Sequence, residues 1–197
     1  MSSTNRGGVR EVSDYYRTPE KPILQFLSAW SEDDPVLISF HYPLPLKVLD
    51  TCAGGVVGQQ DMSYPAALRK FYGESNVNVT TVDIRKDSPC QIHGDYLQMK
   101  PLSEDIDLVI TNPPFCLALP IIQKALTEPC KRVVMLLRLN FFGTKMRKLW
   151  WQNNMPEFTY VHSERISFTG GTSDSIEYMH CVWSKGWKEQ FTRLRII

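Results

Sequence analysis

The stretch DLVITNPPF, residues 107–115, decides the fold of this chain. Its first five residues form an apolar run of strand length, and two prolines then fix the backbone of a rigid turn. Further strand-like runs lie at 46–50, 77–84, 92–97, 132–137, 158–162 and 178–183, and helical spacing occurs at 19–30, 64–71, 117–127 and 145–151. Apolar strands that alternate with helices predict an α/β fold, with a mostly parallel sheet of about seven strands flanked by helices.

Length and composition indicate a single globular domain over residues 1–197. The chain has 43% hydrophobic and 22% charged residues, which is ordinary for a soluble protein. Residues 1–14 are polar and contain glycine, so we expect a mobile N-terminal tail. No apolar run approaches the roughly 18 residues of a membrane helix, and the N-terminus lacks the apolar stretch of a signal peptide. A cytoplasmic protein with no membrane partner is therefore expected.

The spacing of cysteines and histidines argues against a metal site. The five cysteines are scattered, none forms a CxxC pair, and the four histidines have no metal-ligand spacing. An odd cysteine count also argues against a disulfide framework. We expect no metal, and reduced cysteines that pack as small buried side chains.

Four polar side chains lie at or just beyond the ends of four predicted strands, namely Asp50, Asp83, Asp95 and Asn112. In parallel α/β sheets, ligands bind beyond the carboxyl ends of the strands. Each residue alone also fits an ordinary turn at the end of a strand. Their succession, each after its own strand, favours a binding site at this edge of the sheet.

The turn at Asn112-Pro113-Pro114-Phe115 suits chemistry on an amine. The side-chain oxygen of Asn112 and the carbonyl of Pro113 can converge as acceptors. An exocyclic base amine is a poor nucleophile because its lone pair is delocalised into the ring, and two acceptors would localise that pair. Phe115 can stack a base, which contributes about 1–3 kcal/mol. The alternative interpretation of the prolines alone is a rigid strand-exit turn.

The three preceding strand ends suit a nucleotide-like cofactor. The turn after Asp50 contains Ala53 and Gly54, whose small size lets the backbone approach a ligand. Asp83 is placed as an acceptor for a ribose diol. Asp95 could accept from the amino group of an adenine ring, with Tyr96 packed on that ring.

Together these motifs resemble the amino-group DNA methyltransferases of the Rossmann-like class. LDTCAGG (49–55) resembles the cofactor loop, VDIR (82–85) the ribose-binding acid, GDYL (94–97) the adenine-binding acid, TNPPF (111–115) the catalytic motif, and SDYYRTP (13–19) the segment closing over the cofactor's methionine end. Residues 136–183 further resemble the small N6-adenine methyltransferases of phages and prophages. A phage-encoded chain would act in the host cytoplasm.

The resemblance implies S-adenosylmethionine as the cofactor and direct methyl transfer to adenine N6 in DNA. Duplex DNA would require the adenine to be flipped out of the stack. An antiparallel last strand is also implied. The catalytic candidates are Asn112, Pro113, Pro114 and Phe115, and the cofactor-binding candidates are Tyr16, Thr18, Asp50, Cys52, Ala53, Gly54, Asp83, Ile84, Asp95 and Tyr96.

A local basic surface would have to bind the nucleic acid, because the net charge is only +1. Basic residues near aromatic ones in the second half of the chain suit phosphate contacts. For Trp150 and Trp151 themselves, we favour a place in the core. The nucleic-acid-binding candidates are Arg138, Asn140, Lys145, Arg147 and Arg165.

Two alternatives to a DNA adenine methyltransferase remain open on the sequence. An enzyme of the same class could methylate RNA adenine or a protein glutamine amide, because these amines are chemically similar. A catalytically inactive binding or regulatory module is motivated by the glycine pattern at 54–58, GGVVG, which departs from the G-x-G of the family. The intact NPPF motif argues against the second alternative.

Overall fold

The computed structural model describes residues 17–34, 44–59, 61–101, 106–168 and 175–197. The tail expected at 1–14 lies outside these ranges. The described helices are α1 (Glu20–Asp33), α2 (Ser63–Tyr72), α3 (Ala118–Ala125) and α4 (Lys148–Asn153). The strands are β1 (Leu46–Asp50), β2 (Val77–Asp83), β3 (Ile92–His93), β4 (Ile106–Thr111), β5 (Cys130–Arg138), β6 (Phe158–Val161), β7 (Tyr178–Ser184) and β8 (Arg193–Ile196).

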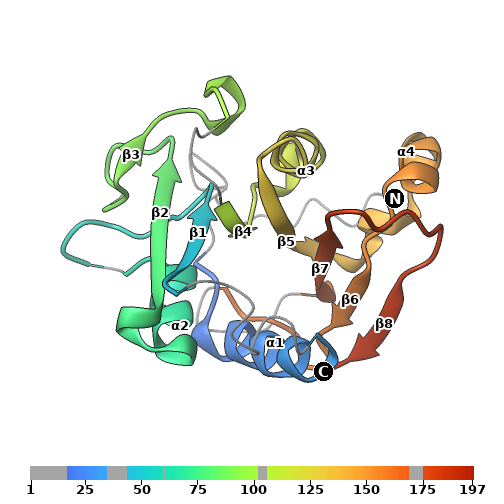
Figure 1. Cartoon of the computed structure of the whole chain (residues 1–197), viewed down its shortest axis with the longest axis horizontal. Helices are drawn as coiled ribbons and strands as arrows, with labels where there is room; N and C mark the ends of the chain where they lie inside the picture. Colours follow the sequence, from blue (N-terminus) through green and yellow to red (C-terminus); the bar gives the residue numbers. More distant parts are fainter. Residues whose placement is uncertain (1–16, 35–43, 60, 102–105, 169–174) are drawn as a thin grey trace.

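The described strands form one sheet with the order β3-β2-β1-β4-β5-β7-β6-β8. Figure 1 shows these strands in this order from left to right. Strand β7 lies antiparallel to both β5 and β6, and the other pairs are parallel. The mostly parallel α/β fold is thus confirmed. The count of seven strands was too low, because β8 adds an eighth strand at the edge of the sheet. Three of its four residues are exposed, so the strand lacks the apolar run that marks the others.

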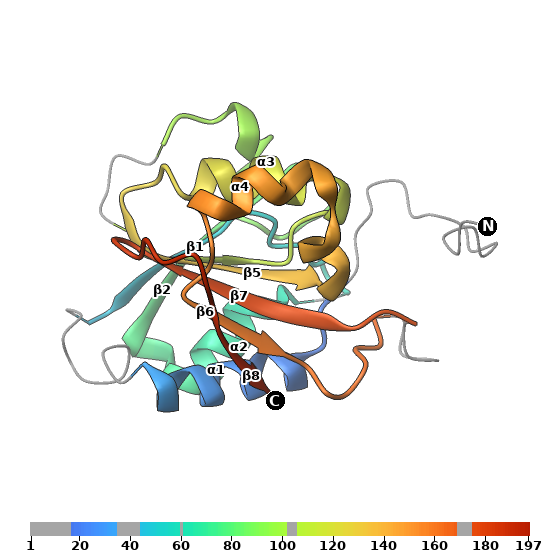
Figure 2. The same ribbon diagram turned by 90° about the vertical axis from the view of Figure 1, so that its right-hand side faces the viewer.

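Helices cover both faces of the sheet. In Figure 2, α3 and α4 lie on one face, and α1 and α2 lie on the other. All six residues of β4 are buried, as expected for a central strand covered on both sides. Two apolar clusters fill the layers, one beneath α1 and α2 and one beneath α3 and α4. Trp151 is buried in the second cluster and Trp150 packs against it, which confirms their expected place in the core.

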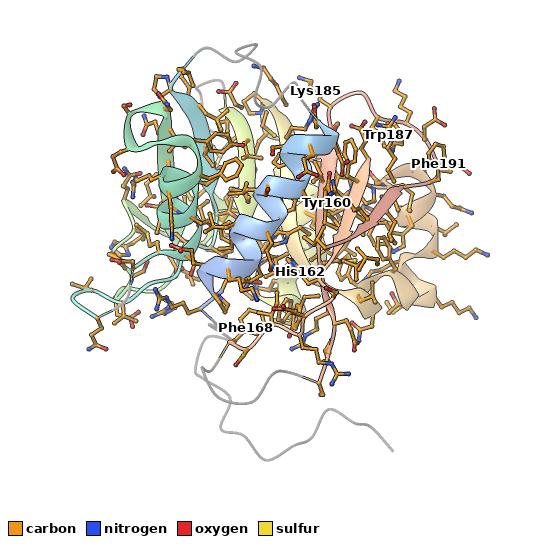
Figure 3. All side chains as sticks on the ribbon, turned by 90° about the horizontal axis from the view of Figure 1, so that it is seen from below. Tyr160, His162, Phe168, Lys185, Trp187 and Phe191 are labelled. Atoms are coloured by element: carbon orange, nitrogen blue, oxygen red, sulfur yellow. The ribbon has the colours of Figure 1, made fainter. Side chains whose placement is uncertain are left out.

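Helix α1 packs an apolar stripe onto the sheet. Ile23, Phe26, Leu27 and Trp30 have helical spacing and are all buried. Figure 3 shows the helix crossing this face of the sheet, with Tyr160 and His162 beside it. The sequence Thr18-Pro19-Glu20 predicts that Thr18 caps this helix, with Pro19 as its first residue. This prediction is wrong, because the helix begins at Glu20, Pro19 occupies the capping position, and no side-chain capping bond forms there.

Among the described residues, no helix combines the length and the apolar character needed to cross a bilayer. The carboxyl ends of β1, β2 and β4 meet at one edge of the sheet, because these neighbouring strands are parallel. The candidate site lies at this edge.

Candidate functional site at the strand ends

A cleft opens at the carboxyl edge of the sheet, and most of the predicted site residues line it. It is bounded by the turns after β1, β2 and β4, by the segment before α1 and by the start of α2. The predicted residues in its lining are Thr18, Cys52, Ala53, Asp83, Ile84, Asp95, Tyr96, Asn112, Pro113, Pro114 and Phe115. Tyr16 lies outside the described residues. Asp50 and Gly54 lie behind the lining.

The glycine turn after β1 supports the cleft through its backbone. The amide of Ala53 donates to the carbonyl of Val82 at 2.9 Å, which joins this turn to the end of β2. Gly54 has a φ of 65°, a left-handed conformation that favours glycine. Its amide donates to Asp83 Oδ2 at 2.8 Å, so Gly54 orients an acid of the cleft from behind.

Asp83 is held as a carboxylate acceptor facing the cleft. Besides Gly54, the amide of Arg85 donates to its Oδ1 at 2.8 Å. Each carboxylate oxygen can accept more than one hydrogen bond, so both retain capacity for a ligand hydroxyl. The neighbouring Ile84 is exposed on the rim and offers an apolar side chain to a ligand ring.

Asp95 and Tyr96 form the wall next to Asp83. The amide of Leu97 donates to Asp95 Oδ1 at 3.0 Å, which leaves Oδ2 as an acceptor beside the cleft. The Tyr96 hydroxyl donates to Glu128 Oε1 at 3.0 Å, so the ring is fixed from its far end. Burial and the nearby Glu128 carboxylate raise the pKa of Tyr96, so the phenol stays protonated.

Asp50 is fully buried beneath the floor of the cleft. Its Oδ1 accepts from Thr111 Oγ1 at 2.7 Å and from the amide of Cys52 at 3.3 Å, which ties the end of β1 to the end of β4. Its Oδ2 has no hydrogen-bond partner among the described residues. Burial raises the pKa of Asp50 to about 7, and the nearby Asp83 adds to the effect. The structure therefore gives Asp50 a supporting position.

Residues Asn112–Phe115 follow β4 directly and form the opposite wall. Asn112 Nδ2 donates to Thr18 Oγ1 at 3.0 Å, which connects this turn to the segment before α1. The carbonyl of Pro114 accepts from the amide of Leu117 at 2.8 Å and starts the short helix η4 (Phe115–Leu117). Asn112 and the two prolines thus present a fixed edge to the cleft.

The Phe115 ring is held by Arg138 and Tyr178. The guanidinium of Arg138 lies 4.3 Å from the centre of the Phe115 ring, and the Tyr178 ring lies 5.6 Å away. Tyr178 is buried, so the support is rigid. Arg138 therefore lies directly beside the catalytic candidate, at the end of β5.

The other nucleic-acid-binding candidates differ in whether their side chains already form bonds within the protein. Arg147 donates to the carbonyl of Phe141 at 2.7 Å and stacks on that ring, so it supports the local fold. Arg165 pairs with Glu177 at 3.0 Å, and both are exposed. Asn140 and Lys145 are exposed near the carboxyl end of β5.

Several residues that line the cleft were not predicted as cofactor contacts from the sequence, notably Arg17, Ser63, Tyr64 and Arg85. Arg17 and Arg85 lie within the motifs at 13–19 and 82–85, which was the available sequence signal. Ser63 and Tyr64 open α2, the first helix after the glycine turn. Nothing in their local sequence distinguishes them from ordinary helix residues.

Tyr64 also begins a buried chain of polar groups. Its hydroxyl lies 3.0 Å from His180 Nε2, and His180 Nδ1 lies 2.8 Å from His162 Nε2. Burial lowers the pKa of His162 to about 4 and lowers that of His180 well below its usual value. Both histidines are therefore neutral core residues near pH 7, and the chain holds the Tyr64 side chain.

No metal site is found in the described ranges, where no group of three or more His, Cys, Asp or Glu side chains could hold an ion. The polar groups at the cleft instead suit an organic ligand. Two carboxylates offer acceptors, Arg17 offers an exposed cation, and Ile84 and Tyr96 offer apolar surface.

No family model and no curated protein matches the sequence. Solved structures do share the fold. The 23S rRNA methyltransferase ErmE matches with a TM-score of 0.55 and 14% identity, over 88% of this chain and 71% of its own. A protein from Pyrococcus horikoshii proposed to be an RNA methyltransferase matches with a TM-score of 0.54 and 18% identity, over 86% of both chains. The chain thus has the Rossmann-like fold of these methyltransferases.

Proposed function

We propose that this chain is a methyltransferase that uses S-adenosylmethionine and acts on an exocyclic amine, N6 of adenine in DNA. One observation carries the proposal. The cleft brings Asp83, Asp95 and the turn at 112–115 together at the carboxyl edge of the sheet, in a fold shared with known methyltransferases. A cofactor and an amine could therefore meet in a single cleft.

The donor set fits S-adenosylmethionine. Asp83 would accept from the ribose hydroxyls, and Asp95 from the adenine amino group, with Tyr96 and Ile84 packing on the ring. Arg17 would face the carboxylate of the methionine end. When bound, the cofactor supplies an activated methyl group. The chain's own task is to place the acceptor amine in line with that group.

Asn112 and Phe115 would position the acceptor. The Asn112 side-chain oxygen and the Pro113 carbonyl accept hydrogen bonds from the amine and localise its lone pair. Phe115, braced by Arg138 and Tyr178, provides a ring on which the base stacks. Transfer is then direct, with no covalent intermediate on the protein.

RNA is the second candidate substrate. The solved structures that share the fold include the 23S rRNA methyltransferase ErmE and the Pyrococcus horikoshii protein proposed to be an RNA methyltransferase. DNA is favoured because residues 136–183 resemble the small adenine methyltransferases of phages. The same wall at 112–115 would present an RNA adenine equally well.

Transfer of tritium from labelled S-adenosylmethionine tests the proposal, with DNA, RNA and glutamine-containing peptides assayed in parallel. We expect labelled DNA with the wild type and loss of label with Asn112→Ala. Label in the peptides alone would overturn a nucleic-acid substrate. Calorimetry with S-adenosylmethionine addresses the inactive-module alternative, which would gain support from a protein that folds but does not bind the cofactor.

A further inference from the structure

The hydroxyl of Thr18 has a partner that the sequence did not predict. Thr18 is buried, precedes α1 by two positions and makes no capping bond to that helix. Its Oγ1 instead accepts a hydrogen bond from Asn112 Nδ2 at 3.0 Å, across 94 positions of sequence. Thr18 therefore contacts the side chain on which the proposed chemistry depends.

This bond holds the Asn112 amide against the segment before α1. A side-chain amide has a donor NH₂ group and an acceptor oxygen at opposite corners of one plane. With Nδ2 directed at Thr18, the oxygen lies at the other corner of the amide plane. The amine that receives the methyl group donates a hydrogen bond to that oxygen, whereas the Asn112 NH₂ group would repel the hydrogens of the amine. If the Asn112 amide were rotated by a half-turn, its NH₂ group would face the amine and methyl transfer would not be supported.

We propose that Thr18 is a positioning residue for methyl transfer, and that its hydroxyl holds the Asn112 side chain in place at the wall of the cleft. This inference rests on the proposed function of the cleft. It departs from the role implied by the resemblance, in which Thr18 closes over the methionine end of the cofactor. The two roles predict different kinetic consequences.

Substitution Thr18→Val separates the two roles, since valine has nearly the same shape but no acceptor. If Thr18 positions Asn112, kcat falls about 10- to 100-fold because the amide is misaligned. The Kd for S-adenosylhomocysteine then stays within about twofold of the wild type, and Thr18→Ser restores kcat. Thr127→Val is the matched control, because Thr127 is exposed and its hydroxyl donates to the Lys124 carbonyl at the end of α3.

A double-mutant cycle tests whether Thr18 acts through Asn112. In the Asn112→Ser background, which lacks the amide group and whose residual rate is measured first, Thr18→Val should cause no further loss of kcat. A weakened Kd in Thr18→Val with kcat unchanged would overturn the positioning role and favour direct cofactor contact. Unchanged kcat and Kd would overturn it as well.

An NMR measurement that needs no substrate tests the Thr18 bond independently of the proposed function. The side-chain ¹⁵N–¹H signals of Asn112 can be assigned by their loss in Asn112→Ala. They should shift in Thr18→Val and return in Thr18→Ser. Signals that do not move would contradict the Thr18 bond, whatever the enzyme methylates. A wild type that methylates nothing, with the shift present, would instead refute the proposed function.

Discussion

Replacing Asp50 by asparagine should change how stability depends on pH. The Asp50 carboxyl is fully buried, and its Oδ2 has no hydrogen-bond partner among the described residues. Burial is the largest cause of its raised pKa, against which the hydrogen bonds from Thr111 and Cys52 act. Asparagine keeps one acceptor oxygen and cannot ionise. The substitution thus removes a buried charge at high pH and leaves the shape almost unchanged.

The sign follows from the two pKa values of Asp50, which are 3.8 ordinarily and about 7 in the folded chain. Between these values the folded state binds more protons than the unfolded state, so the free energy of unfolding decreases as pH rises. Above about pH 7 the loss is complete. A difference of about three pKa units corresponds to about 4 kcal/mol, which is the largest change expected.

Urea unfolding at several pH values between 4.5 and 8 measures the effect. The free energy of unfolding of Asp50→Asn, minus that of the wild type, should rise from pH 4.5 to about pH 7 and then level off. Asp87→Asn is the control, because Arg85 lowers the pKa of Asp87 below 3.8 and its difference should stay flat above pH 5. A flat difference for Asp50→Asn would show that this carboxyl ionises at its ordinary pKa, and would refute the argument.

Three further predictions concern the buried histidine chain and the two walls of the cleft. His162→Gln should act in the opposite direction to Asp50→Asn. The pKa of His162 is about 4 when folded and 6.5 ordinarily, so the wild type loses stability as pH falls through this window, by at most about 3 kcal/mol. Urea unfolding at pH 5 and 7 should show a larger loss of stability in the wild type than in His162→Gln, because His180 and Asp50 titrate in both proteins. Equal losses would contradict the prediction. Asp83→Ala should weaken the Kd for S-adenosylhomocysteine about 10- to 100-fold, as expected for a lost charged hydrogen bond. Calorimetry measures this, and an unchanged Kd would remove Asp83 from the cofactor site. Phe115→Leu should weaken binding of single-stranded DNA by about 1–3 kcal/mol through lost stacking, with cofactor affinity retained. Fluorescence anisotropy checks this, and equal affinities would argue that no base stacks on Phe115.

The sequence carried enough information to predict the layers of the fold and the edge where the cleft lies. The strands at 107–111 and 132–137 are buried on both faces, so each can be recognised in the sequence as a continuous apolar run. Asp83, Asp95 and Asn112 each follow a strand, and parallel pairing was sufficient to bring them together. Strand β8 was missed because an exposed edge strand needs no continuous apolar run.

Contacts between distant segments could not be predicted in this way. Asp50 and Asp83 both end strands, yet only Asp83 lines the cleft, because the turn after β1 covers Asp50. Thr18 looked like a helix cap by local spacing, whereas its partner Asn112 lies 94 positions away. Tyr64 pairs with His180 across 116 positions. Such pairings depend on the tertiary packing of α1, α2 and the sheet.

Mass spectrometry of nucleosides tests the central claim most directly. The wild type and Asn112→Ala would be expressed in a host without adenine methylation of its own, and nucleosides from DNA and RNA would be analysed separately. We predict N6-methyladenine in the DNA of cells with the wild type and none with Asn112→Ala. Unmodified adenine in both nucleic acids, from a folded protein that binds S-adenosylmethionine, would contradict the proposed function.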